Sequence, residues 1–175
     1  MSAATQARIS LAELNAMSRE QFTRHLGAVL EHSPQFAGRV FESRPFKSSE
    51  SLHGAFVHAI ECAPDTEQLA LIRAHPDLAN RLEHLTAEST QEQSSAGLDE
   101  LSAGQLREFQ RLNTAYRKRF EFPFIICARL NSRDAILASF ESRLKNSREE
   151  ELKTALGEVA KIAHIRLYDL IESEG

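Results

Sequence analysis

The sequence of 175 residues has no tryptophan, only two cysteines, and no excess of positive charge. Lys and Arg number 21 against 25 Asp and Glu, which gives a formal net charge of −4. Nucleic-acid binding depends on clustered positive charge, so this balance argues against that class of partner. The densest basic run, Arg117-Lys118-Arg119, is interpreted as a solvent-exposed helix face.

Long apolar runs and targeting patterns are also lacking. No stretch approaches the 18 or more apolar residues of a membrane span, and the first ten residues have no signal-peptide core. Cys62 and Cys127 do not form a CxxC pair, which favours free thiols in a reducing compartment. The final residues are not the peroxisomal Ser-Lys-Leu signal. We therefore expect a soluble, cytoplasmic protein with no membrane or nucleic-acid partner.

Motifs for metals, nucleotides and nucleophilic serine are absent as well. The only E-x-x-H is Glu50-x-x-His53, whereas a di-iron bundle needs two such motifs and two further carboxylates. There is no H-E-x-x-H, no glycine-rich phosphate loop and no G-x-S-x-G. We therefore expect no metal site and no cofactor, and acid–base chemistry is what remains.

Helical periodicity dominates what is present. Ser18 with Gln21, Ser102 with Gln105, and Ser147 with Glu150 have the spacing of capping boxes, each followed by apolar residues at helical spacing. Apolar residues also keep a helical period between positions 48 and 64, after Asp65, and after Asn131-Ser132. No segment alternates with a period of two. The sequence predicts an all-α, single-domain protein of about seven to nine helices and no sheet, comprising residues 1–175.

One predicted helix depends on where a proline stops it. Phe22, Leu26, Val29 and Leu30 share a helix face, and Pro34 is predicted to close that helix.

Two segments do not fit the helical pattern. Residues 84–97 are polar with little periodicity, and residues 120–130 are an apolar run interrupted by Pro123. Local departures of this kind often mark functional segments.

His75 is the first candidate for chemistry. It directly precedes Pro76, which disfavours the helical conformation, so its side chain is expected to project from a helix end. The ordinary imidazole pKa near 6.5 suits proton transfer at neutral pH. The alternative is a structural histidine that interacts with the helix dipole.

Glu92 and Arg166 are the other two candidates, and each has a structural alternative. Glu92 ends a Ser89-to-Glu92 capping box, but no clean apolar stripe follows, which leaves a carboxylate beside Gln93 in a polar segment. Arg166 lies on the apolar stripe of the last predicted helix, where a guanidinium needs an anion. That anion is either an internal carboxylate or one on a substrate.

Several sequence blocks follow one another in order along the chain: HPDLA at 75–79, STQEQSSAGL at 89–98 and RFEFPFIICAR at 119–129. Together they resemble the signature segments of the OHCU decarboxylase family, which residues 151–159 and 165–167 also fit. OHCU is 2-oxo-4-hydroxy-4-carboxy-5-ureidoimidazoline, an unstable intermediate between urate and allantoin. The resemblance covers about residues 10–172.

This resemblance implies an all-α homodimeric enzyme that converts OHCU to (S)-allantoin by decarboxylation, without a cofactor, in urate degradation. It implies that His75 is the catalytic proton-transfer residue, that Glu92 is its acidic partner, and that Arg166 engages a substrate anion. The residues implied to line the substrate pocket are Pro76, Ser89, Thr90, Gln91, Glu92 and Gln93, with the backbone of Phe124, Ile125, Ile126, Cys127 and Ala128. The lack of a peroxisomal ending favours a bacterial-type cytoplasmic enzyme.

Two other functions remain as alternatives. A hydrolase of a ureido or cyclic amide substrate would use His75 and Glu92 to activate water, and would release ammonia or a ring-opened acid in place of CO₂. A non-catalytic helical interaction module would dock a partner through the last helix. In that case replacing His75 would change no activity.

Overall fold

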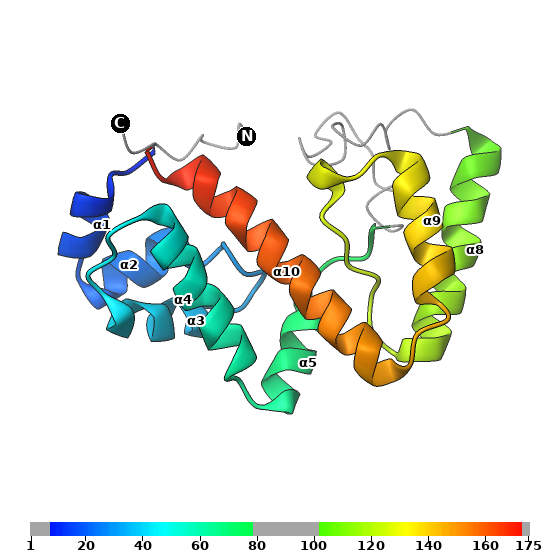
Figure 1. The fold of residues 1–175 in the computed structure, drawn as a ribbon, viewed down its shortest axis with the longest axis horizontal. Coiled ribbons are helices and arrows are strands. Elements are labelled where there is room, and N and C mark those ends of the chain that lie inside the picture. The colour runs from blue at the N-terminus through cyan, green and yellow to red at the C-terminus, as the bar shows by residue number, and fades with distance from the viewer. Residues whose placement is uncertain (1–7, 79–101, 173–175) are drawn as a thin grey trace. The chain divides into compact units, whose positions relative to one another are not determined.

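Helices make up the regular structure of the protein. The computed structural model describes residues 8–78 and 102–172 (Figure 1). Within these ranges the α-helices are α1 (Leu11–Ala16), α2 (Arg19–Leu26), α3 (Pro34–Val40), α4 (Ser49–Glu61), α5 (Asp65–Ala74), α8 (Ala103–Phe120), α9 (Arg133–Arg143) and α10 (Arg148–Leu170). Short 3₁₀ helices are η1 (Phe41–Ser43) and η3 (Ala128–Leu130). The described residues contain no β-strand beyond an isolated bridge between Ile9 and Ile171, so the all-α prediction is confirmed.

The predicted capping boxes are present at three helix starts. The Ser18 and Ser102 hydroxyls accept the backbone N–H of Gln21 and Gln105, whose side chains in turn accept the serine N–H. Glu150 and Ser147 make the same reciprocal pair, with distances of 2.8 and 3.2 Å. Each box satisfies N–H groups that the first helical turn leaves without intrahelical partners.

The prediction that Pro34 closes the helix beginning near Ser18 is wrong. Helix α2 ends at Leu26, and Pro34 is the first residue of α3. Proline suits that position because its missing N–H would have no intrahelical partner there. Val29 and Leu30 are buried in the turns between the two helices, so their burial does not require a helix.

The chain divides into two compact units, each described here by itself. The first contains the residues up to Leu71 and those from Ala160 onward, and the second runs from Ile72 to Val159. In the first unit, α3 packs against both α2 and α4. Its core includes Phe22, whose ring lies 5.5 Å from that of Phe41 and 6.3 Å from that of Phe46. The single domain expected from the sequence stays a prediction.

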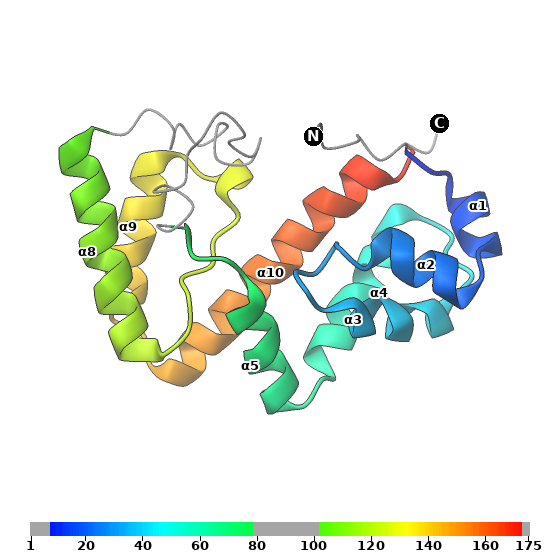
Figure 2. The same ribbon diagram turned by 180° about the vertical axis from the view of Figure 1, so that it is seen from behind.

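The second unit is built around α8 and α9, which lie side by side in both views (Figures 1 and 2). Its core is a cluster of aromatic rings centred on Tyr116, with Phe120, Phe122, Phe124 and Phe140 around it. The rings of Phe124 and Phe140 stack with their centroids 3.6 Å apart. Phe124 belongs to the segment after Pro123, so this segment is part of the hydrophobic core.

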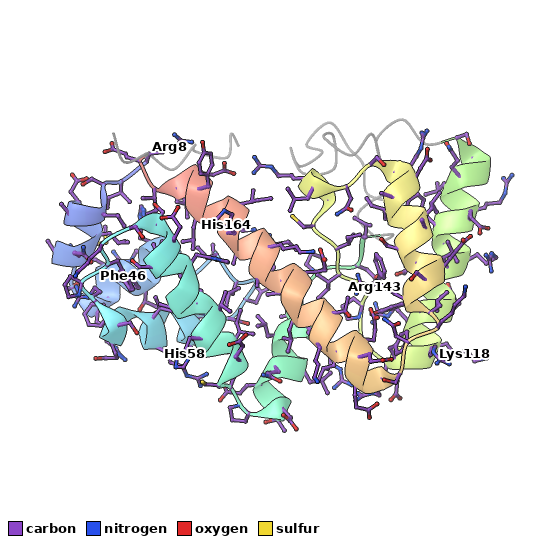
Figure 3. The ribbon with its side chains drawn as sticks, viewed as in Figure 1. Arg8, Phe46, His58, Lys118, Arg143 and His164 are labelled. Atoms are coloured by element: carbon purple, nitrogen blue, oxygen red, sulfur yellow. The ribbon has the colours of Figure 1, made fainter. Side chains whose placement is uncertain are left out.

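The outer surface of α8 carries the basic run, as predicted. Arg117, Lys118 and Arg119 are all exposed, and Lys118 is labelled in Figure 3. Among the described helices none is long and apolar enough to cross a membrane.

Candidate active site

His75 lies at the end of a helix, where the sequence places it. Helix α5 ends at Ala74, and the His75 N–H still donates to the carbonyl of Ile72 at 3.2 Å. Pro76 follows and is exposed. The expectation that the His75 side chain projects from the scaffold is wrong, because the residue is only 6% exposed.

Two arginines connect residues next to His75 with the C-terminal end of α8. Arg117 of α8 forms an ion pair with Asp77, whose side chain is 2% exposed while that of Arg117 is 50% exposed. Arg73, in the last turn of α5, donates to the carbonyl of Glu121 at 3.3 Å. Glu121 caps α8 in the left-handed conformation with a φ of 62°. These contacts hold the residues on both sides of His75 and Pro76.

The second catalytic candidate, Glu92, lies outside the described residues. So do the neighbouring pocket candidates Ser89, Thr90, Gln91 and Gln93. Their assignment therefore rests on the sequence alone.

The segment predicted to contribute backbone groups has the irregular form that Pro123 implied. Residues 123–127 form no helix, and η3 begins at Ala128. Every residue from Phe124 to Ala128 is buried, with exposures between 1% and 9%. The prediction that this run is neither a surface loop nor a continuous helix is confirmed. A buried irregular backbone has peptide groups that the helices do not satisfy.

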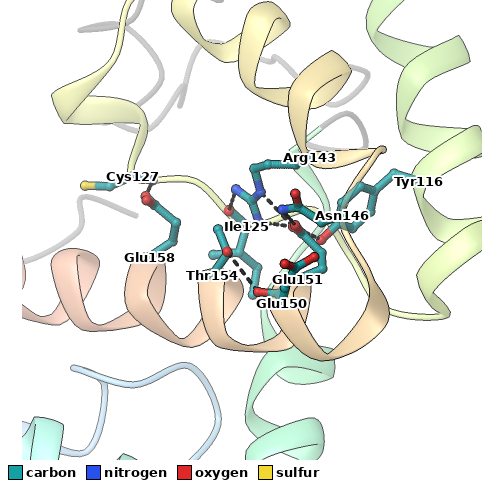
Figure 4. Close-up of polar contacts among 9 residues, drawn as sticks. All are labelled: Tyr116, Ile125, Cys127, Arg143, Asn146, Glu150, Glu151, Thr154 and Glu158. Carbon is teal, nitrogen blue, oxygen red and sulfur yellow. Dashed lines mark hydrogen bonds and ion pairs between the residues drawn. The ribbon is translucent and has the colours of Figure 1, made fainter.

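Buried charged side chains supply some of the missing hydrogen bonds (Figure 4). Arg143 of α9 donates through Nη1 to the carbonyl of Ile125 at 2.7 Å. Glu158 of α10 accepts the N–H of Cys127 at 2.8 Å. Arg143 also donates through Nε to Glu151 at 2.6 Å. The arginine and both glutamates are at most 8% exposed.

Glu151 is the centre of this polar cluster. It is fully buried and accepts hydrogen bonds from Arg143, the Tyr116 hydroxyl, and the Asn146 amide at 2.9 Å. Burial raises the pKa of the Tyr116 phenol far above its ordinary value, and the hydrogen bond to the Glu151 carboxylate raises it further. Tyr116 therefore keeps its proton near neutral pH and donates it in the hydrogen bond to Glu151.

Sequence reasoning missed Arg143, Glu151 and Glu158. The available signal was helical spacing, because Arg143 lies three residues after Phe140, and Glu151 lies four residues before Ala155. From the sequence, a buried charge of this kind is predicted only at Arg166.

Arg166 has the internal carboxylate that was one of its two alternatives. Its Nη2 lies 2.7 Å from Glu31, and Nη1 donates to the carbonyl of Val29 at 3.2 Å. The side chains of Arg166 and Glu31 are 19% and 22% exposed, so the ion pair is only partly buried. Arg166 belongs to the first compact unit, whereas His75 and the Phe124–Ala128 segment belong to the second.

No group of three or more His, Cys, Asp or Glu side chains suited to a metal ion occurs in the part of the chain that the structure describes. Cys62 and Cys127 are both free thiols, the first exposed and the second buried.

Comparison with known proteins gives this geometry a context. A family model described as OHCU decarboxylase matches residues 15–168. A protein of Haloferax volcanii named 2-oxo-4-hydroxy-4-carboxy-5-ureidoimidazoline decarboxylase is 44% identical over 166 residues, covering 95% of this chain and 98% of its own. A protein of the same name from Mus musculus is 42% identical over 166 residues, covering 93% of each chain.

Solved structures agree with these sequence relatives. A crystal structure of OHCU decarboxylase in the presence of (S)-allantoin has a TM-score of 0.68 and 27% identity, covering 90% of this chain and all of that one. A crystal structure of (S)-allantoin synthase has a TM-score of 0.78 and 26% identity over 94% of this chain, which spans about half, 55%, of that protein. Because the family model and both relatives span most of its length, the chain belongs to the OHCU decarboxylase family.

Proposed function

We propose that this protein decarboxylates OHCU to (S)-allantoin in the degradation of urate. The observation that carries the proposal is the match over residues 15–168 to the OHCU decarboxylase family, together with relatives of that name over nearly the whole chain. The family activity is a carbon–carbon lyase reaction that needs only binding, orientation and a proton.

The substrate itself can hold the electrons that decarboxylation releases. Its carboxylate and hydroxyl are on ring carbon 4, beside carbon 5 with its ureido group and its double bond to ring nitrogen. When the bond to CO₂ breaks, the electron pair moves into the ring and that nitrogen gains a proton. A proton then adds to carbon 5 while the hydroxyl becomes a carbonyl, which gives allantoin. The side from which the proton arrives decides the hand of the product.

We assign the delivery of that proton to His75. Its buried position at the end of α5 protects the imidazole from water, and a positioned acid–base group of this kind contributes about 10²–10⁴-fold to a rate. Glu92 is assigned the partner carboxylate that orients His75 or binds the hydroxyl or ureido group. Protonation from one side would give (S)-allantoin, whereas decay in water gives both hands.

Substrate binding is assigned to the segments that depart from the helical pattern. Pro76, residues 89–93 and the backbone of Phe124–Ala128 are proposed to line the pocket, and Arg166 to engage a substrate anion. The buried, irregular backbone of Phe124–Ala128 supports this assignment, because peptide N–H and C=O groups match the urea and amide groups of OHCU. The reaction as proposed uses no cofactor.

The test is to add the protein to freshly generated OHCU and follow CO₂ release together with optical rotation. The proposal predicts faster CO₂ release and a rotation that develops to that of pure (S)-allantoin. Release of ammonia or of a ring-opened acid would instead identify a hydrolase. No acceleration over buffer would refute the proposed function.

We also propose a cytoplasmic homodimer in which both compact units serve a single functional domain. The resemblance to the family implies the homodimer. The single domain is supported by one family model, which matches residues from both compact units. The free thiols of Cys62 and Cys127 fit a reducing compartment. Light scattering coupled to gel filtration tests the dimer, and fractionation of cells tests the location.

A further inference from the structure

We infer that Glu158 and Arg143 are positioning residues that orient the two peptide groups flanking Ile126 for substrate binding. The inference rests on the proposed function, in which the Phe124–Ala128 backbone lines the pocket. It assigns a role to two buried charges that the proposed chemistry does not otherwise use.

The two side chains reach the same short piece of backbone from different helices (Figure 4). Arg143 of α9 binds the carbonyl of Ile125 at 2.7 Å, and Glu158 of α10 binds the N–H of Cys127 at 2.8 Å. The first contact fixes the peptide group before Ile126, and the second fixes the peptide group after it. The bond from Arg143 includes a charged guanidinium, which makes it stronger than a bond between neutral groups.

Because peptide groups are planar, these two contacts also fix the directions of the N–H and C=O bonds of Ile126. In a trans peptide group the C=O and N–H bonds point in opposite directions. Because the Ile125 carbonyl points at Arg143, the Ile126 N–H points away from Arg143. For the same reason the Ile126 carbonyl points away from Glu158. A donor and an acceptor are thereby fixed on one residue.

Within the described ranges, neither the N–H nor the C=O of Ile126 has a hydrogen-bond partner. The residue is only 9% exposed, and buried peptide groups are nearly always satisfied by protein, water or ligand. A donor and an acceptor from one residue complement the C=O and N–H of a urea or amide. OHCU has such groups in both its ring and its ureido substituent.

The cluster around Glu151 explains why the orientation would persist without substrate. Glu151 is fully buried and holds the Arg143 guanidinium through Nε while Nη1 reaches Ile125. Asn146 and Tyr116 satisfy further lone pairs of the same carboxylate. Rotation of the peptide group before Ile126 would therefore disrupt a network of charged hydrogen bonds, which is costly in a buried site.

Two substitutions at Glu158 distinguish the effect of its side-chain length on substrate binding from the effect of its charge. Glu158→Asp keeps the charge but withdraws the carboxylate from Cys127 by one carbon–carbon bond, whereas Glu158→Gln keeps the reach and an acceptor oxygen without the charge. We expect Glu158→Asp to raise KM for OHCU and the inhibition constant of (S)-allantoin about tenfold, with kcat changed less than about threefold. Glu158→Gln should keep KM within about twofold of the wild type.

Arg143→Lys tests the other peptide group, because a lysine cannot bridge Glu151 and Ile125 with a planar fork. It should also raise KM more than it lowers kcat, measured per folded molecule by circular dichroism. The matched controls are Glu149→Asp, exposed on α10, and Arg133→Lys on α9, which should leave KM unchanged.

The outcomes are distinguishable. If the wild type is active, and Glu158→Asp and Arg143→Lys only lower the melting temperature with KM unchanged, the positioning role is refuted and the proposed function stands. A rise in KM for Glu158→Gln as large as that for Glu158→Asp would also overturn it, because an acceptor oxygen within reach of Cys127 would then not be enough to keep KM. A wild type that does not accelerate CO₂ release refutes the proposed function and this inference with it.

Discussion

At the scale of single residues, His75 is where structure and chemistry make the sharpest prediction. If His75 delivers the proton as proposed, its replacement with Asn should lower kcat for CO₂ release by about 10²–10⁴-fold. Because His75 is buried, the smaller side chain should also lower the melting temperature by a measurable amount. Stereospecific turnover, followed by optical rotation and scaled to folded protein, is the measurement.

The control for this variant is His164→Asn, an exposed histidine on α10, which should turn over OHCU like the wild type. Near-normal turnover by His75→Asn would mean that another group delivers the proton.

Arg166 presents a choice that its contact with Glu31 makes testable. If Arg166 engages a substrate anion, Arg166→Lys should raise KM about tenfold, because an ammonium cannot make the planar two-pronged contact. Glu31→Gln should then lower the melting temperature slightly, since the ion pair is only partly buried, and leave KM near normal. Steady-state kinetics and thermal unfolding of both variants give the comparison. If both instead lose stability equally and keep KM, the ion pair with Glu31 accounts for Arg166.

At the scale of elements, the C-terminal end of α8 contacts the residues next to His75 through the ion pair between Arg117 and Asp77. Arg117→Ala would leave the Asp77 carboxylate almost fully buried without its cation, which should cost about 1–3 kcal/mol of unfolding free energy. The same change should lower kcat, because the residues beside His75 lose an anchor. Urea unfolding and turnover of the variant test both effects. Lys118→Ala, the exposed neighbour on α8, should change neither quantity.

Helix starts were predictable from the sequence because capping is local. Ser18, Ser102 and Ser147 lie three residues from the side chains that complete their boxes. The end of α5 before Pro76 was predictable for the same reason. Pro34 was not, since a proline that ends one helix and a proline that begins the next look alike in sequence.

The candidate site was predictable only where a resemblance or a local rule identified its residues. The charged side chains that bind the Phe124–Ala128 backbone act over long sequence separations, as Arg143 does with Ile125 and Glu158 does with Cys127. Periodicity places such residues on an apolar face but does not name their partners. The burial of His75 was missed because it depends on tertiary packing, whereas the proline rule concerns only the local backbone.

At the scale of the whole molecule, the unfolding free energy should depend on pH through His25. Burial lowers the pKa of His25 below its ordinary value near 6.5, so the folded protein binds a proton there less readily than the unfolded chain does. Unfolding free energy falls as pH falls wherever the unfolded state binds more protons. The contribution of His25 is therefore fully present above about pH 6.5 and is lost as the pH drops toward the folded-state pKa.

His25→Gln removes this titration, so its unfolding free energy should fall less than that of the wild type between about pH 7.5 and about pH 5.5. Urea unfolding at both pH values measures the difference directly. His58→Gln is the matched control, because His58 is exposed on α4, and it should keep the wild-type pH dependence. If His25→Gln lost stability on acidification as steeply as the wild type, burial of His25 would not be a source of acid sensitivity in this fold.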